Sequence, residues 1–333
     1  MTDFQPFDDT LVYSSYIREY HPIEKDLLYN DLCRNSFNEF HRKETTLYMI
    51  VKTDRIEFVP ESFCIGGGFR VQGNVRVGGR VEAVVFNVAK FLFARSGVTD
   101  RYSCWEEWAE QVMSDWQIDG DAEVTAAQTY RQFSKIDLKL STGELLYIDC
   151  KLSQAIKQGN MASRTIVSPV QLAQSFDWNL LGQLEVLYIG KSTDGVLSRA
   201  RNHNKWGAIT TDLSPEEVAI VYFMDIETKS TAREQTGPFV TFREFKDKGI
   251  DRESHALITE AALIKHFFSE KRYNERIVGQ DFEKVKRVKE KLLHRGYTSV
   301  FAELRLDGVF GNVGTPKTGY RAEHEYIRSL REL

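Results

Sequence analysis

Residues 184–206 read LEVLYIGKSTDGVLSRARNHNKW, and this stretch decides the predicted fold of the C-terminal half. The apolar segment LEVLYIG (184–190) ends in a glycine and predicts a β-strand. The following GVLSRARNHNKW (195–206) predicts a basic helix, in which Arg199 and His203 are four residues apart and share one face. The rest of the prediction starts from this strand and helix.

Three further elements follow on the C-terminal side. The segment VAIVYFMDI (218–226) predicts a buried strand because it is apolar almost throughout. The segment HALITEAALIKHFF (255–268) predicts an apolar helix with one carboxylate, Glu260, and a carboxylate in such surroundings needs a partner. After the turn RYNER (272–276), a basic helix over residues 283–295 is predicted to end at Gly296.

Four motifs in this order are similar to those of one nuclease family. LYIGKS followed by LSRARNH looks like the second half of the GIY-YIG motif and its arginine helix, and the helix with Glu260 followed by YNE looks like that family's metal-binding glutamate and asparagine. The C-terminal module therefore resembles the GIY-YIG nuclease superfamily, in particular its restriction-type and defence-type endonucleases. The resemblance implies a small three-stranded sheet flanked by helices, which cleaves DNA, with RNA not excluded as a substrate.

The resemblance also implies a set of site residues by position. Tyr188 is similar to the tyrosine of the YIG half-motif, and Gly190 to the glycine that lets the backbone turn there. Lys191 is similar to a residue found in relatives that act as restriction enzymes. The implied catalytic residues are Tyr188, Lys191, Arg199, His203, Glu260 and Asn274, with Glu260 as the metal ligand and Mg²⁺ (or Mn²⁺) as the cofactor. Arg201 and Lys205, on the same predicted helix, are the expected contacts to nucleic-acid phosphates.

Phosphodiester hydrolysis requires these residue types. The attacking water must be activated, the charge on the phosphoryl oxygens neutralised, and the leaving oxygen stabilised. Mg²⁺ prefers oxygen ligands and keeps several waters, so a single carboxylate such as Glu260 suffices to hold it. Arg199 would bind the phosphate through its rigid fork of N–H donors. Tyr188 or Lys191 would position or deprotonate the water if the site lowered its pKa toward neutrality.

Two features depart from the family pattern. The first tyrosine of the motif is expected shortly before Tyr188, but Asp177 and Trp178 stand there, so the identity of the general base stays open. The chain between the strand that ends at Ile226 and the Glu260 helix is also unusually long. We therefore predict an inserted loop over residues 227–254 that affects the choice of substrate.

The segment KIDLKLSTGELLYIDCK (135–151) offers an alternative active site. It predicts two strands joined by a turn, with Asp137 on the first strand and Asp149 and Lys151 on the second. This layout is similar to a PD-(D/E)xK nuclease core, in which two carboxylates bind metal and the lysine orients water. A catalytically inactive DNA-binding protein is a further alternative, favoured by the missing first tyrosine. All three interpretations stay open on sequence grounds.

The N-terminal part shows no repeat or long linker. Residues 46–60 predict a pair of strands around Asp54, residues 66–80 predict glycine-rich hairpins, and residues 81–97 predict a helix. We therefore predict an α/β (α+β) protein with three parts. These are a mixed α+β recognition or accessory domain over residues 1–170, a GIY-YIG-like nuclease module over residues 171–280, and a basic helix and tail over residues 281–333.

Composition limits the class of protein. The 333 residues are 42% hydrophobic and 28% charged, as in an ordinary globular protein. No stretch approaches the roughly 18 apolar residues of a membrane span, and the N-terminus MTDFQPFDDT lacks the features of a secretory signal. We therefore expect a cytoplasmic protein with no membrane partner, whose state of homo-oligomerisation stays open. Because the net charge is -4, binding to DNA would require local basic patches.

Overall fold

The computed structural model describes residues 11–30, 45–95, 97–115, 130, 133–156, 164–192, 195–236, 239–246, 249–268, 274, 280–306 and 311–333. The chain forms two compact units: unit 1 comprises residues 1–53 and 181–333, and unit 2 comprises residues 54–180. Unit 2 is therefore a continuous insertion into unit 1. These boundaries differ from the predicted ones at residues 170 and 280, because both terminal parts of the chain belong to the same unit.

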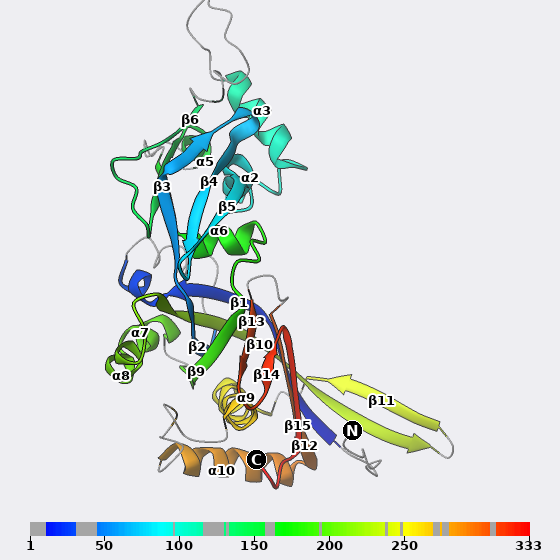
Figure 1. Ribbon diagram of the computed structural model, residues 1–333. Helices are drawn as coiled ribbons and strands as arrows, with labels where there is room; N and C mark the ends of the chain where they lie inside the picture. Colours follow the sequence, from blue (N-terminus) through cyan, green and yellow to red (C-terminus); the bar gives the residue numbers. More distant parts are fainter. Residues whose placement is uncertain are drawn as a thin grey trace, which may run out of the picture. The chain divides into compact units, whose positions relative to one another are not determined.

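Unit 1 is built around a nine-stranded sheet (Figure 1). Eight strands follow the order β14-β13-β9-β2-β10-β1-β12-β15, and β11 pairs with β10 outside this path. The pairs β1–β12 and β9–β13 are parallel, whereas β1–β10, β2–β9, β10–β11, β12–β15 and β13–β14 are antiparallel. The strands are β1 (Leu11–Glu24), β2 (Leu47–Asp54), β9 (Gln183–Lys191), β10 (Glu217–Thr236), β11 (Phe239–Phe245), β12 (Tyr297–Arg305), β13 (Asn312–Thr315), β14 (Gly319–Arg321) and β15 (Glu323–Ser329).

The predicted fold class is wrong. The described chain is mostly β, and the strands predicted at 184–190 and 218–226 do not form a separate three-stranded sheet after an N-terminal α+β domain. They lie in the nine-stranded sheet as β9 and β10, with the N-terminal strand β2 between them. The hydrophobic pattern reveals each strand, but pairing between distant segments depends on backbone hydrogen bonds that no local pattern encodes.

Short helices cover one face of the β9-β2-β10 region. They are η1 (Lys25–Tyr29), α7 (Val196–Arg201) and α8 (Trp206–Thr211). The apolar cluster between these helices and the strands comprises Ile23, Leu28, Tyr48, Ile50, Leu187, Val196, Ala200, Trp206, Ile209, Ala219, Val221 and Phe223. The alternating β2 residues Met49 and Val51 are buried as well, so both faces of β2 are covered.

Two longer helices complete unit 1: α9 (Arg252–Phe267) and α10 (Gln280–His294). Helix α9 begins three residues before the predicted helix because the Asp251 side chain caps it, accepting a hydrogen bond from the Ser254 backbone N–H at 2.8 Å. It packs against β9 and β12. The predicted basic helix corresponds to α10, which packs against α9 and is followed by Gly296 with a positive φ of 85°.

The long segment after Ile226 is not the predicted loop. Strand β10 continues to Thr236, and β11 pairs with it in antiparallel register from Ser230↔Phe245 to Thr236↔Phe239. Figure 1 shows these strands continuing as a two-stranded ribbon beyond the other strands of unit 1. Phe242 is 70% exposed, so this ribbon is not part of the core.

Unit 2 contains two three-stranded antiparallel sheets and several short helices. The first sheet has the order β3-β4-β5, with β3 (Ile56–Ile65), β4 (Arg70–Val77) and β5 (Arg80–Asn87), and η2 (Gly67–Phe69) precedes β4. The second has the order β6-β7-β8, with β6 (Ser134–Ile136), β7 (Leu146–Cys150) and β8 (Arg164–Val167). The helices are α2 (Val88–Phe93), α3 (Trp105–Asp115), α5 (Leu152–Ile156) and α6 (Pro169–Ser175).

The predictions for residues 46–97 are confirmed in part. Strands exist on both sides of Asp54, but β2 and β3 belong to different sheets and do not pair. The glycine-rich hairpin is β4–β5, whose turn places Gly78 and Gly79 at positive φ values of 50° and 83°. The helix predicted over residues 81–97 is wrong in its first half, because residues up to Asn87 alternate between core and solvent as β5.

The described part of the chain contains no helix that is both long and apolar enough to cross a membrane.

Candidate active site

Strand pairing in unit 1 brings Tyr48 next to Tyr188. In the antiparallel register of β2 and β9, Tyr48 lies opposite Gly190, so Tyr48 and Tyr188 are diagonal neighbours on one face of the sheet. Their ring centroids are 5.8 Å apart. The two tyrosines are 140 positions apart in the sequence because unit 2 lies between their strands.

Gly190 provides the space for both rings. A Cβ atom at this position would lie 2.5 Å from Cε1 of Tyr188 and 2.7 Å from Cζ of Tyr48, closer than real Cβ contacts allow. The strand continues to Lys191 without a turn. The role expected for this glycine in a backbone turn is therefore wrong, since its observed role is to leave room for two aromatic rings.

His203 packs against both tyrosines. It follows α7, is 4% exposed, and its ring centroid lies 4.2 Å from that of Tyr188 and 6.0 Å from that of Tyr48. Burial, together with the nearby positive charges of Arg199 and Lys205, lowers the pKa of His203 to about 4, so the imidazole is neutral at pH 7. Its Nδ1 accepts a hydrogen bond from the Lys205 backbone N–H at 3.2 Å, which leaves the proton on Nε2.

Arg199 and Glu260 both influence the pKa of Tyr48. Burial raises the pKa of Tyr48 well above its usual range, the neighbouring Tyr188 and Glu260 raise it further, and Arg199 lowers it. Arg199 is exposed on α7, and Glu260 is half-buried on α9. The two helices therefore bring a cation and a carboxylate to the tyrosine pair from different parts of unit 1.

Two buried polar atoms of this cluster lack a standard hydrogen bond. Within the described residues, Nε2 of His203 has no hydrogen-bond partner, and the Tyr48 hydroxyl makes no hydrogen bond of standard geometry, although its interaction with the Tyr188 side chain raises the pKa of Tyr48. A buried donor without a partner costs free energy on the order of 1–3 kcal/mol. A polar ligand or water that accepted a hydrogen bond from such a donor would remove this cost.

Asn274 holds the edge of β9 at the centre of the YIG segment. Its side-chain Nδ2 donates to the Ile189 carbonyl at 2.7 Å, and its Oδ1 accepts from the Ile189 N–H at 3.2 Å. Strand β13 pairs with β9 only along residues 183–185, so it does not reach Ile189. The Asn274 amide therefore takes the place of a neighbouring strand there and acts as a positioning residue for β9.

The remaining predicted residues lie around this cluster. Lys191 is half-buried at the end of β9, opposite Leu47. Arg201, which is predicted to contact DNA, donates through Nε to the Leu28 carbonyl, while its own carbonyl accepts from the Tyr29 hydroxyl. Arg201 thus attaches η1 to α7. Lys205 is half-buried before α8.

The geometry of unit 2 does not favour the alternative site. Arg164 of β8 bridges the two carboxylates, with Nε 2.9 Å from Oδ1 of Asp149 and Nη2 3.1 Å from Oδ2 of Asp137. The Nζ atom of Lys151 lies 5.3 Å from the ring centroid of Phe133. A guanidinium that already neutralises both carboxylates takes the position that a metal ion would need.

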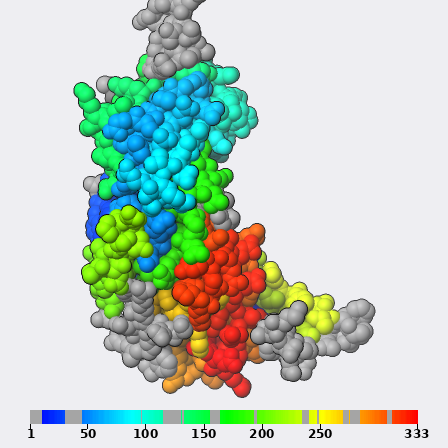
Figure 2. All heavy atoms as spheres, in the orientation of Figure 1, coloured from blue at the N-terminus to red at the C-terminus, as the bar shows by residue number. Residues whose placement is uncertain are grey.

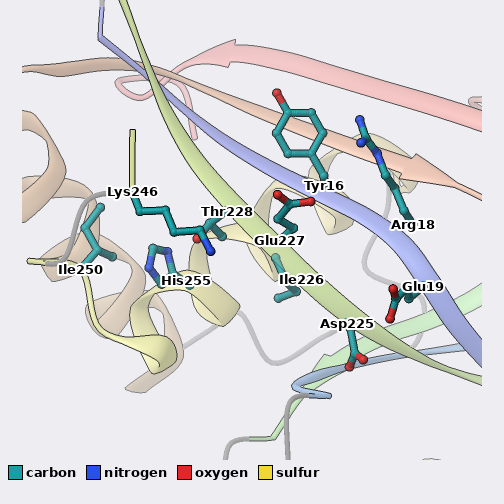
Figure 3. A pocket seen from close by; sticks show the side chains of 10 residues that line it. All are labelled: Tyr16, Arg18, Glu19, Asp225, Ile226, Glu227, Thr228, Lys246, Ile250 and His255. Carbon is teal, nitrogen blue, oxygen red and sulfur yellow. The ribbon is translucent and has the colours of Figure 1, made fainter. Parts of the chain in front are cut away.

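A cavity of about 600 Å³ lies elsewhere in unit 1, between β1, β10, the segment after β11, and α9 (Figure 3). Its lining mixes acidic and basic side chains, among them Arg18, Asp225, Lys246 and His255. None of the predicted site residues lines this cavity, so it is separate from the tyrosine cluster.

One group of the cluster, the Glu260 carboxylate, has the chemistry to hold a hard divalent cation. The described residues contain no group of three or more His, Cys, Asp or Glu placed to bind a metal together, so a closed protein cage is not formed by them. Mg²⁺ does not require such a cage, because one carboxylate, waters and substrate phosphate oxygens can complete its coordination. Glu260 is half-buried, its charge acts on the pKa of Tyr48, and it is the residue of the cluster that could hold such a cation.

Tyr48 is the site residue that sequence reasoning missed. The family motif has its first tyrosine shortly before the second along the chain, whereas the structure places Tyr48 beside Tyr188 in space. One signal was present: LYMI (47–50) and LYIG (187–190) both read as a leucine and a tyrosine in a predicted strand.

Comparisons with protein-family models, with curated proteins and with solved structures find no match to this chain.

Proposed function

We propose that this protein is a metal-dependent endonuclease of the GIY-YIG superfamily, which hydrolyses phosphodiester bonds in DNA in the cytoplasm as a restriction or phage-defence enzyme. The observations that support it most are the contact of the Tyr48, Tyr188 and His203 rings and the influence of Arg199 and Glu260 on the pKa of Tyr48. These residues come from β2, β9, α7, the segment after α7, and α9. In this proposal Tyr48 takes the place of the first tyrosine of the motif, with unit 2 inserted between the motif's two halves.

Each side chain has a role that follows from its protonation state. The Arg199 guanidinium, exposed on α7, binds the scissile phosphate and neutralises its charge. Because its pKa is raised, Tyr48 is a neutral phenol at pH 7 and donates a hydrogen bond instead of acting as a phenolate base. His203 is neutral as well and donates from Nε2. Hydrogen-bond donors that are fixed in place before the substrate binds stabilise charge developing on phosphoryl oxygens.

Glu260 holds the divalent cation, Mg²⁺ or Mn²⁺, in this proposal. When bound there, the cation supplies Lewis-acid stabilisation of the phosphate and the leaving oxygen. In the fold, the charges of Glu260 and Arg199 both act on the pKa of Tyr48. A cation held by Glu260 would therefore lie near Tyr48 and Arg199. Asn274 fixes the β9 backbone that carries Tyr188 and Gly190, so it acts on the site through Ile189.

The proposal is tested by cleavage of a supercoiled plasmid in Mg²⁺ and in EDTA, with the wild-type chain and with Glu260→Gln. Glutamine keeps the size of the side chain but removes the charge that a hard cation needs, so we expect cleavage to slow by at least about a hundredfold. Glu253→Gln is the matched control, since Glu253 is an exposed glutamate on the same helix. A thermal melt must show that Glu260→Gln is folded.

Two results would refute this assignment. One is a folded Glu260→Gln protein that cleaves at the wild-type rate, and the other is a wild-type chain that binds plasmid but never cleaves it. Asp149→Asn separates the alternative site from this one. Because Asp149 is bound to Arg164, we expect that variant to lose stability and to keep its cleavage rate per folded molecule.

A further inference from the structure

The β3-β4-β5 sheet of unit 2 has two chemically different faces. Val71, Val75, Val84 and Phe86 alternate on the inner face and are buried. The ring of Phe86 lies 6.2 Å from that of Trp178, measured between centroids. This inner face accounts for the stability of the sheet and leaves the outer face available for another role.

The outer face carries one row of long polar side chains on the central strand. Along β4 the outward residues are Arg70, Gln72, Asn74 and Arg76, and all except the half-buried Asn74 are exposed. Their cross-strand partners on β5 are Asn87, Val85, Ala83 and Val81, in that order. Val81 is 60% and Val85 41% exposed, so small apolar side chains lie beside the polar row in direct contact with solvent. Figure 2 shows the blue-to-cyan atoms of this segment forming a continuous part of the surface.

The charge of this face is complementary to DNA. Arg70 and Arg76 supply the positive charge of the row. The acidic side chain beside the row is Glu57, which pairs with Arg76 at 3.3 Å while Arg76 stays 54% exposed. The described outer face is therefore basic in a chain whose net charge is -4, as local phosphate binding requires.

The residue types and their spacing match base readout. Arginine pairs with guanine O6 and N7, asparagine and glutamine pair with adenine N6 and N7, and small apolar groups contact the thymine methyl. Outward residues of one strand are about 6.8 Å apart, since the rise is about 3.4 Å per residue. This distance is close to two base steps of about 3.4 Å each. The major groove is wide enough to admit two strands of a sheet.

We propose that the outer face of the β3-β4-β5 sheet binds the major groove of duplex DNA and determines the sequence preference of the protein. The proposal rests on the proposed function, since it assumes that the substrate is DNA. Arg70, Gln72 and Arg76 contact base edges from the central strand, and Val81 and Val85 contact thymine methyl groups. Unit 2 is thus the recognition part, inserted in the chain between the strands that carry Tyr48 and Tyr188.

The test uses the full-length chain and a library of 30-base-pair duplexes with a randomised centre, selected for binding in EDTA so that no cleavage occurs. The dissociation constants of the selected duplex and of a scrambled duplex are then measured for wild type, Arg70→Ala and Gln72→Ala. Arg101→Ala removes an exposed arginine of unit 2 outside the sheet and is the matched control. Thermal melts establish that each variant is folded.

We expect Arg70→Ala and Gln72→Ala each to weaken binding of the selected duplex by about ten- to a hundredfold, while the scrambled duplex changes by less than about threefold. A second selection with each variant should lose its preference at one or two adjacent positions. Arg101→Ala should affect both duplexes alike.

Three outcomes overturn the proposal: a wild-type chain that selects no sequence, variants that keep the wild-type preference, or variants that lose affinity equally for both duplexes. These outcomes are distinguishable from a failure of the proposed function. If the chain still cuts plasmid in Mg²⁺ while its variants keep the wild-type sequence preference, only the proposed role of the outer β3-β4-β5 face is refuted. A chain that selects a sequence and never cuts refutes the nuclease assignment alone.

Discussion

Gly190 shows how one missing methyl group determines the arrangement of a site. Because a Cβ at this position would overlap Tyr48 and Tyr188, we expect Gly190→Ala to displace one ring and to cost on the order of 1–3 kcal/mol of unfolding free energy. Cleavage should fall more than stability does, since the displaced rings belong to the site. Gly182→Ala is the matched control, because its added Cβ would meet no described heavy atom within 4 Å. Denaturant unfolding measures the free energy of unfolding of both variants, and plasmid cleavage measures their activity. A Gly190→Ala protein with wild-type activity would contradict the expected displacement of the rings.

His203 makes stability depend on pH. Its pKa is lowered from 6.5 to about 4 in the fold, mainly by burial, so between these values the unfolded chain binds more protons than the folded one. The contribution of His203 is therefore fully present above pH 6.5 and is lost as the pH falls toward 4. His266, also lowered to about 4, acts in the same direction.

We expect the melting temperature to fall between pH 6.5 and pH 4, and to fall less steeply in His203→Gln. His294→Gln, which changes an exposed histidine on α10, should keep the wild-type slope. Thermal melts at several pH values decide the point. Equal slopes in all three proteins would mean that His203 is not buried in its neutral form.

Strand β9 is the element on which the site depends, and Asn274 supports its open edge. Asn274→Ala removes both hydrogen bonds to Ile189, so we expect a loss on the order of 1–3 kcal/mol and faster hydrogen exchange of the Ile189 amide. Asn202→Ala, which removes one exposed hydrogen bond to Ser198, should leave that amide unchanged. Unaltered protection of Ile189 in Asn274→Ala would show that another group holds this edge.

Individual elements were predictable because their patterns are local. The strand 184–190, the helix with Glu260 and the hairpin that contains Asp149 all exist, since each depends on hydrophobic alternation or helical spacing within a few residues. The pairing of β9 with β2 was not predictable, because it joins segments on either side of a 127-residue unit. The same reason explains why Tyr48 was missed and why the strand pair around Asp54 was assigned to one sheet.

At the scale of the whole molecule, the central feature is a site divided by an insertion. Unit 2 begins at the end of β2 and ends before β9. The two strands that carry the tyrosine pair are therefore neighbours in the sheet despite their separation in sequence. Inserted domains are tolerated where the two ends of the insertion leave adjacent strands. The proposal thus assigns cleavage to unit 1 and recognition to unit 2.

The rate of plasmid cleavage by Tyr48→Phe tests this account most directly. The matched control is Tyr326→Phe, because both hydroxyls are buried and neither makes a hydrogen bond of standard geometry with the described residues. Each substitution removes one oxygen without opening a cavity, so both variants should melt at or above the wild-type temperature. If Tyr48 belongs to the same site as Tyr188 and Glu260, Tyr48→Phe cleaves at least about tenfold more slowly than wild type, and Tyr326→Phe cleaves at the wild-type rate. Equal, wild-type rates for both variants would contradict the assembly of one active site from the two sides of the insertion.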